Sequence, residues 1–484
     1  MAVTARLPKR EVNEPDVMHF NAFTDQAMTR ASGAPLIHGN GVRLLRDATE
    51  NYPAWIEAIE SAREWIHFET YIIHDDKSGR LFGELLEAKA REGVKVRLMY
   101  DWVGSLGYRS WRFFRQLRRA GVEVRCFNPP GIEFPFTWFT RDHRKLIAVD
   151  GRIAYVTGLC VGDQWIGSPS KHTDPWRDNG VEIEGPALTE IERAFASSWA
   201  TRGSPVPLDE IPRVGSLPRA GNVAVRVVAG APNVGGLYRV DQLITTFARR
   251  SIWLEDAYFA GTSAYVEALR AAASAGVDVR LLLPGANDIP VMRAVSRAGL
   301  RPLLEAGVRV FEWNGSMMHA KTAVVDGRWA RVGSTNLNIA SWMNNWELDL
   351  IVENAGFARE IDQMFLGDLE NSTEIVLNRN RPRAIAKRSS TYALGKGTAT
   401  KTAAGVMRIG RAVRAAFTDR ELGPAEAVLM FWSAIILIVL ACAALLWPKF
   451  IAYPIAIVAL WVSMLLLLRA ARPKQRKKEE SCPE

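Results

Sequence analysis

The sequence predicts an α/β protein built from two similar α/β/α sandwich halves, packed together as a pseudo-dimer and followed by a C-terminal transmembrane helical hairpin. Through the first 377 residues, short Val-, Ile- and Leu-rich runs alternate with longer Ala-, Glu- and Arg-rich runs. This alternation is typical of helices that cover a mainly parallel sheet. Two long apolar runs then follow near the end of the chain, each long enough to cross the apolar core of a bilayer.

The two halves are predicted from an internal repeat, in which equivalent segments return after roughly 180 residues. Glu69 in the first half aligns in this way with Glu255 in the second. The repeated pairs are REWIHFETYII and RSIWLEDAYF, EGVKVRLMYD and AGVDVRLLLP, and AGVEVRCF and AGVRVFEW. We therefore expect a first domain at 36–203, a linker at 204–220 and a second domain at 221–377.

Each half also contains one His-x-Lys-x4-Asp-Gly-Arg motif. The motif residues are His143, Lys145 and Asp150 in the first half, and His319, Lys321 and Asp326 in the second. Each motif runs into a short apolar segment that ends at Asp-Gly, which predicts a buried strand stopped by a turn. Residues two apart on a strand share a face, so each histidine should lie beside its lysine. One copy would favour an ordinary buried histidine, but two copies predict a site.

The two aspartates of the motifs, Asp150 and Asp326, stand at strand ends before Gly-Arg. We include both among the candidate catalytic residues, although a turn cap or an ion pair that holds the strand is the favoured role.

Two histidines and two lysines are the set of groups that cleavage of a phosphodiester requires. The reaction needs a nucleophile, a proton source for the leaving oxygen, and positive charge around the other oxygens. A histidine near neutral pH serves as nucleophile when neutral and as acid when protonated, so a facing pair can divide these roles. The near symmetry of the halves leaves open which histidine attacks.

The doubled motif resembles the phospholipase D superfamily. The GSTN that follows the second motif and the glutamate of NNWELDL fit the same family. The segments FETYIIHDDKSGRLFGELLEAKAREGVKVRLMYDWVGS and RLLLPGANDIP are similar to its bacterial cardiolipin synthase branch, and the resemblance extends over residues 36–375. It implies two phospholipase D-like halves whose motifs line one cleft.

The resemblance also implies a role for each residue of the site. His143 is the nucleophile that forms a phosphohistidine, and His319 protonates the departing alcohol and later deprotonates the incoming one. A catalytic histidine needs a carboxylate on its other ring nitrogen to fix its tautomer. We assign Glu347 to His319, and Asp178 to His143.

The predicted phosphate-binding groups differ between the halves. Lys145 and Lys321 are expected to hold phosphate oxygens as point charges. Ser334 and Asn336, in the GSTN turn, are expected to add neutral hydrogen bonds to the same oxygens. The first half reads TGLC at the equivalent turn, which places Cys160 where the second half has Asn336.

The cysteines predict neither a metal site nor a disulfide framework. They are scattered without CxxC or His-rich spacing, which suits a reducing compartment. Cys160 has no evident base beside it and is a poor candidate nucleophile. The four cysteines are Cys126, Cys160, Cys442 and Cys482. No metal and no cofactor are expected.

The positive charge of the chain lies in its tail. The net charge is +9, but residues 378–484 hold 18 Lys and Arg against 6 Asp and Glu, so the first 377 residues are slightly acidic. A nuclease should carry its positive field on the catalytic body. A nuclease is therefore disfavoured, and no nucleic-acid partner is expected.

The tail itself predicts membrane attachment. The apolar runs at 424–447 and 451–468 are separated only by PKF, and Arg- and Lys-rich segments flank them. This pattern predicts a hairpin with both ends in the cytoplasm. The segment 402–417 fits an amphipathic helix on anionic lipid or a solvated linker helix. The expected parts are an N-terminal extension (1–35), a basic linker with that helix (378–423), two transmembrane helices (424–470) and a basic cytoplasmic tail (471–484).

An aromatic segment just before the first motif has three possible roles. FPFTWF, residues 134–139, fits the lining of the cleft, contact with the membrane, or plain core packing.

The residues and the resemblance together predict a bacterial inner-membrane phosphatidyltransferase of the cardiolipin synthase type. Its catalytic body would face the cytoplasm, its basic C-terminal region would meet anionic lipid, and its substrate would be phosphatidylglycerol. The alternative is a phospholipase D that gives water the same covalent intermediate and releases phosphatidic acid; a nuclease on this fold ranks below both.

Overall fold

The computed structural model describes residues 14–106, 110–129, 140–168 and 173–377, with a few isolated positions after residue 434. The chain divides into one compact unit up to Asn378 and a second from Arg379 onward. The predicted basic linker, transmembrane hairpin and tail, and the aromatic segment 134–139, lie outside the described residues. Among the described residues, no helix is both long enough and apolar enough to cross a membrane.

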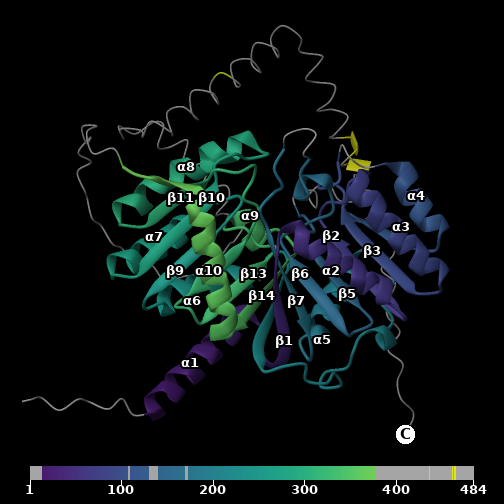
Figure 1. Cartoon of the computed structure of the whole chain (residues 1–484), viewed down its shortest axis with the longest axis horizontal. Helices are drawn as coiled ribbons and strands as arrows, with labels where there is room; N and C mark the ends of the chain where they lie inside the picture. The colour runs from purple at the N-terminus through teal and green to yellow at the C-terminus, as the bar shows by residue number, and fades with distance from the viewer. Residues whose placement is uncertain are drawn as a thin grey trace, which may run out of the picture. The chain divides into compact units, whose positions relative to one another are not determined.

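Within its described residues, the first half of the unit that ends at Asn378 contains seven strands and four α-helices, which Figure 1 labels. Its strands are β1 (Ile37–Arg46), β2 (Trp65–Thr70), β3 (Lys95–Asp101), β4 (Glu123–Phe127), β5 (Leu146–Val149), β6 (Ile153–Thr157) and β7 (Asn179–Glu184). Its helices are α2 (Asp47–Ser61), α3 (Lys77–Arg91), α4 (Trp111–Arg119) and α5 (Leu188–Trp199), and a short 3-10 helix spans Asp163–Trp165. Two further 3-10 turns, Ala200–Arg202 and Leu208–Glu210, lead toward the second half.

The second half repeats this order of elements. Its strands are β8 (Val223–Gly230), β9 (Ser251–Glu255), β10 (Asp278–Pro284), β11 (Arg309–Trp313), β12 (Thr322–Val325), β13 (Trp329–Gly333), β14 (Glu347–Glu353) and β15 (Ser372–Ile375). Its helices are α6 (Gly236–Phe247), α7 (Ser263–Ser274), α8 (Pro290–Glu305), α9 (Ile339–Met343) and α10 (Ala355–Glu370). Helix α1 (Glu14–Ser32) precedes both halves, and its Asp25 forms an ion pair with the buried Arg226 of β8.

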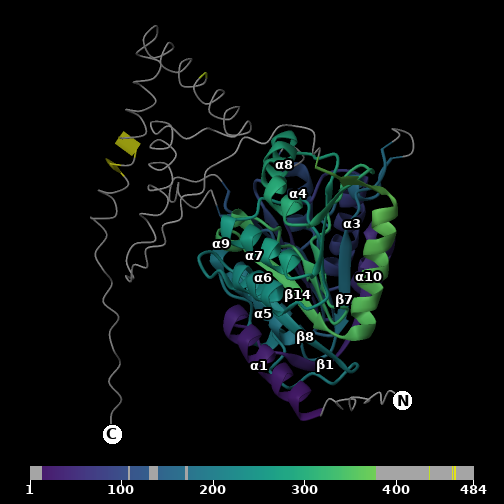
Figure 2. The same cartoon turned by 90° about the vertical axis from the view of Figure 1, so that its left-hand side faces the viewer.

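All of the strands belong to one 15-stranded sheet, in the order β15-β11-β10-β9-β12-β13-β14-β8-β1-β7-β6-β5-β2-β3-β4. Read outward from the central β8–β1 pair, the two halves have the same order, apart from the extra edge strand β15. β1 and β8 lie at one end of the unit, and α4 and α8 lie at the other (Figure 2). The repeat seen in the sequence is thus a repeat of topology.

The expectation of a mainly parallel sheet is wrong. Only β2-β3-β4 and β9-β10-β11 pair in parallel, and the other ladders are antiparallel. The reason lies in the turn after each motif strand, because strands joined by a tight turn must run antiparallel. Asp150 and Gly151 have φ of +54° and +58°, and Asp326 and Gly327 have φ of +55° and +61°. Such a pair of positive φ angles is typical of the tight turns of β-hairpins.

The carboxylates of Asp150 and Asp326 bind backbone N–H groups at the start of the neighbouring strand. The donors are Arg63, Glu64 and Trp65 for Asp150, and Arg249, Arg250 and Ser251 for Asp326, at 2.7–2.9 Å. Each aspartate lies five residues along the strand from its lysine, a span of about 16 Å. These contacts fit the favoured structural role, and a catalytic role for either aspartate stays a prediction.

Four glycines explain the repeated Gly-Val pattern of the sequence. Gly93, Gly121, Gly276 and Gly307 follow α3, α4, α7 and α8, with φ between +92° and +101°. This left-handed conformation ends a helix at little cost only for glycine. The following valine is buried in each case and begins the approach to the next strand.

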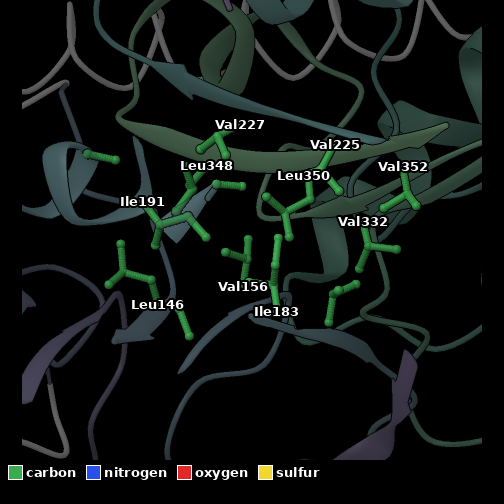
Figure 3. Close-up of a cluster of buried hydrophobic side chains, with 14 of the residues drawn as sticks. Leu146, Val156, Ile183, Ile191, Val225, Val227, Val332, Leu348, Leu350 and Val352 are labelled. Carbon is green, nitrogen blue, oxygen red and sulfur yellow. The ribbon is translucent and has the colours of Figure 1, made fainter. Parts of the chain in front are cut away.

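A central core lies between the two halves, where the apolar faces of their strands meet (Figure 3). In Figure 3, Leu146, Val156 and Ile183 of the first half face Val227 and Leu348 of the second. Separate apolar clusters lie under α2, α3 and α4 on one outer face, and under α6, α7 and α8 on the other. The shared core joins the two halves into one body, as a pseudo-dimer requires.

Candidate active site

Both motifs reach a single pocket of about 750 Å³, a size typical of small-molecule sites. His143 and Lys145 line it from the first half, and His319 and Asn336 line it from the second. Lys321 lies directly behind His319 and is almost fully buried. The structure therefore brings the two predicted His/Lys pairs together.

His143 is held by a carboxylate from the second half. Its Nδ1 lies 3.1 Å and 2.9 Å from the two carboxylate oxygens of Glu347. Glu347 also accepts hydrogen bonds from Ser334 Oγ at 2.5 Å and from Asn345 Nδ2 at 3.2 Å. These contacts leave Nε2 of His143 as the ring nitrogen that is not bound to the carboxylate.

His319 is held in the same way by a carboxylate from the first half. Its Nδ1 lies 2.6 Å from Oδ2 of Asp178. Asp178 also accepts hydrogen bonds from Trp165 Nε1 at 3.3 Å and from the backbone N–H of Asn179 at 2.9 Å. Asp178 immediately precedes β7, and Glu347 begins β14, so the two carboxylates occupy equivalent places in the repeat.

The predicted assignment of the two carboxylates is wrong, because each pair joins one half to the other. The backbone N–H of His143 donates to the carbonyl of Trp346 at 2.9 Å, next to Glu347. The backbone N–H of His319 donates to the carbonyl of Arg177 at 2.7 Å, next to Asp178. Each motif is therefore bridged to the carboxylate segment of the opposite half, and we call the resulting pairs crossed dyads.

The two lysines approach the histidines from behind. Nζ of Lys145 donates to the carbonyl of His143 at 2.5 Å and lies 5.3 Å from the ring centre of Tyr71. Nζ of Lys321 donates to the carbonyl of His319 and lies 2.9 Å from Nδ1 of the same residue. An ammonium group has three donors, so each lysine keeps N–H groups for a phosphate oxygen.

Ser334 and Asn336 have different roles, contrary to the prediction that both bind phosphate. Ser334 is fully buried, donates to Glu347, and accepts the backbone N–H of Leu348 at 2.9 Å. It therefore positions a carboxylate. Asn336 lines the pocket, and its Oδ1 has no hydrogen-bond partner within the described part of the chain. Cys160 lines the same pocket from the first half, as its alignment with Asn336 predicts.

Comparison with known proteins identifies the family. A family model described as "Cardiolipin synthase, PLD-like domain" matches residues 55–199 and 242–369. The chain belongs to this phospholipase D-like family. The resemblance found in the sequence is thus confirmed, and the paired motifs are the family's own signature in this chain.

Relatives agree with this assignment, and one solved structure shares the fold. A cardiolipin synthase from Alkalihalophilus pseudofirmus is 32% identical over 358 residues, which cover 72% of this chain and 70% of that protein. Cardiolipin synthase A from Pseudomonas putida strain W619 is 35% identical over 356 residues, covering 72% and 73%. A phosphatidylserine synthase from Haemophilus influenzae Rd KW20 shares the fold, with a TM-score of 0.57 at 16% identity over 73% of this chain and 92% of that one.

Burial controls the protonation of the site. Burial lowers the pKa of His143, and the charge of Lys145 adds to this effect while Glu347 opposes it. Burial and the charge of Lys321 lower the pKa of His319 to about 3. Both histidines are therefore neutral in the empty pocket at pH 7, which is the form that a nucleophile requires.

Aromatic residues that the sequence analysis did not single out complete the pocket wall. Tyr71 stands edge-on to His143, with ring centres 4.9 Å apart, and Tyr258 stands edge-on to His319 at 6.0 Å. Trp176 packs against His319 at 5.3 Å. The two tyrosines belong to the repeated segments ETY and EDAY, which begin at the ends of β2 and β9. Comparison of those repeats was the signal that could have found them.

Glu69 and Glu255, the aligned glutamates of the repeat, lie on the strands next to the strands that follow the motif lysines. Glu69 of β2 pairs in register with Leu146 of β5, and Glu255 of β9 pairs with Thr322 of β12. Both are almost fully buried, and burial raises the pKa of each. Within the described residues, no group of three or more His, Cys, Asp or Glu side chains is arranged to hold a metal ion.

We expect kcat/KM to fall above about pH 8. Burial lowers the pKa of Lys321 from 10.5 to about 8, although Asp178 opposes the shift. Above that pH the side chain loses its charge, and a cation is lost from the phosphate site. The pH dependence of kcat/KM reports groups of the free enzyme. Initial rates on a phospholipid substrate from pH 6 to pH 11 would measure the midpoint, and a fall centred near pH 10.5 would contradict this role for Lys321.

Proposed function

We propose that this chain is a phosphatidyltransferase that moves a phosphatidyl group from one phosphatidylglycerol molecule to another, which yields cardiolipin and glycerol. The observation that carries the proposal is the pair of crossed dyads at one pocket, with a lysine in contact with each histidine residue. The relatives named cardiolipin synthase support the choice of substrate.

In the first step, His143 attacks the phosphorus of the donor lipid. Glu347 accepts a hydrogen bond from Nδ1–H, so the lone pair of the neutral ring lies on Nε2. The new bond joins Nε2 to phosphorus, and the bond between phosphorus and the glycerol oxygen breaks. Lys145 and Lys321 hold the non-bridging oxygens as negative charge develops on them.

The departing glycerol oxygen takes its proton from His319. This histidine is neutral in the empty pocket because burial and Lys321 disfavour its charged form. A bound phosphodiester brings a negative charge that offsets the nearby lysines, and an opposite charge at close range favours the protonated ring. Asp178 then stabilises the imidazolium through Nδ1.

In the second step, neutral His319 takes the proton from a hydroxyl group of a second phosphatidylglycerol. The resulting oxygen attacks the phosphohistidine, the bond between phosphorus and Nε2 of His143 breaks, and cardiolipin leaves. The two steps use the same residues in reverse order, so His319 returns to its protonated form and His143 to its neutral form.

The proposal includes a place for the enzyme in the cell. The apolar runs and basic flanks of residues 424–470 support a hairpin anchor in the bacterial inner membrane, with the catalytic unit in the cytoplasm. The basic segments on either side would contact anionic lipid. The slightly acidic catalytic unit gives no support to a nucleic-acid substrate.

The deciding experiment places the purified full-length chain in phosphatidylglycerol vesicles and resolves the products by mass spectrometry. We expect cardiolipin and glycerol in equal amounts, and neither product from His143→Ala. Phosphatidic acid without cardiolipin would assign the enzyme to hydrolysis, since water would then have taken the covalent intermediate.

A further inference from the structure

Exposed apolar side chains surround the mouth of the catalytic pocket. They come from the loop after β3, from the start of α8 and the residue before it, and from the start of α9, so both halves contribute. We call these residues the apolar rim: Val103, Leu106, Ile289, Val295 and Ile339. Each has 40–53% of its surface exposed, although all five also line the pocket.

The apolar rim is a concentration of side chains that proteins usually bury. Fifteen large apolar side chains are exposed among the described residues up to Leu377, and these five line this one pocket. Scattered exposed apolar residues are normal, but a contiguous patch marks a site of interaction. The rim therefore indicates a binding surface at the pocket mouth, where a partner covers the apolar side chains.

The polarity of the pocket changes from its floor to its mouth. The buried floor includes His143, Lys145 and His319, which suit an anionic phosphodiester, and the exposed mouth carries the apolar rim. A phospholipid in a bilayer has the same order of groups, with its phosphate outermost and its acyl chains within. A second protein copy seated on the rim would instead close the pocket to its substrate.

We propose that the apolar rim is the surface by which the catalytic unit docks on a phospholipid bilayer. The rim side chains enter the apolar edge of the leaflet, so the headgroup reaches the crossed dyads while the acyl chains stay in the membrane. This inference rests on the proposed function for the identity of the lipid. It assigns the contact to the described catalytic unit itself, separately from the C-terminal tail.

Photo-crosslinking tests the contact without requiring turnover. Benzoylphenylalanine would replace Leu106, Ile289 or Ile339, one at a time, in the full-length chain on phosphatidylglycerol vesicles. The matched control is Leu208, which is 86% exposed and does not line the pocket. We expect lipid adducts at the three rim positions and only background at Leu208, with the same result in a His143→Ala background.

Two outcomes of the crosslinking would overturn the proposal. Equal lipid yields at the rim and at Leu208 would show that the tail alone brings the chain to the membrane. Adducts between two protein chains at the rim would assign the surface to a second copy. The crosslinking is repeated in the His143→Ala protein, so its result does not depend on whether the chain catalyses the proposed reaction.

Activity provides a second measure of the contact. Turnover would be measured on vesicle lipid and on a short-chain phosphatidylglycerol dispersed below its micelle concentration. The double variant Leu106→Ser/Ile339→Ser should lower the ratio of the first rate to the second roughly tenfold or more, because two apolar contacts with the bilayer are lost. Leu208→Ser should leave this ratio at its wild-type value. An equal fall on both substrates would contradict docking and would place the two residues in direct headgroup binding.

Discussion

His143→Ala is expected to abolish the phosphorylated enzyme, whereas His319→Ala is expected to form it and release it slowly. In the first variant no nitrogen is present to attack phosphorus. In the second the nucleophile and its partner Glu347 remain in place, but the incoming hydroxyl lacks a base. Overall turnover should fall by roughly a thousandfold or more in both, as for other covalent catalysts. Rapid acid quenching with lipid labelled at phosphorus would measure the trapped protein.

The two histidines have matched surroundings, so the experiment needs a control outside the pocket. His38, exposed on β1, provides it, and His38→Ala should keep both turnover and the wild-type level of phosphoenzyme. A His143→Ala protein that still traps phosphate, together with a His319→Ala protein that does not, would exchange the two roles.

Glu347→Gln should slow formation of the phosphoenzyme, and Asp178→Asn should slow its release. Each substitution keeps the shape of the side chain but offers the histidine an amide, which favours the wrong tautomer and no longer stabilises the imidazolium. In serine proteases the equivalent change costs about 10⁴-fold in kcat, and a loss of about 10³–10⁴-fold is expected for Glu347→Gln. Pre-steady-state measurement of phosphoenzyme growth and decay separates the two steps.

This pair of variants tests the crossed dyads directly. If each carboxylate served the histidine of its own half, the two phenotypes would be exchanged: Asp178→Asn would impair formation, and Glu347→Gln would impair release. Asn345→Ala is a milder comparison, because it removes one of the hydrogen bonds to Glu347 and leaves the hydrogen bond with His143 intact. It should slow formation less than Glu347→Gln does.

The features that the sequence predicted well are those in which local pattern and structure coincide. The spacing of His143 and Lys145 predicted that both side chains lie together, and both line one pocket, although both residues precede β5 instead of belonging to it. The favoured role of Asp326 as a turn cap followed from Asp-Gly after an apolar run.

The features that the sequence could not give depend on contacts between distant segments. Distance along the chain favoured Glu347 as the partner of His319, but a backbone hydrogen bond from His143 to Trp346 settles the pairing. Ser334 has the spacing of a phosphate ligand, yet its hydroxyl donates to Glu347. The antiparallel ladders follow from the β5–β6 and β12–β13 hairpins. Their position inside the sheet cannot be seen in the sequence of any single segment.

The crossed dyads also bear on the ancestry of the chain. A precursor with a single motif would have had no complete dyad of its own, since the carboxylate for its histidine had to come from another copy. Such a precursor could act only as a pair of identical chains. Once duplication fused the two copies, each half was free to diverge, as Cys160 at the position equivalent to Asn336 shows. Neither half could be lost, because each supplies a carboxylate to the other. The activity therefore requires both halves in one chain. Loss of the carboxylate from either half leaves the histidine of the other half without its partner.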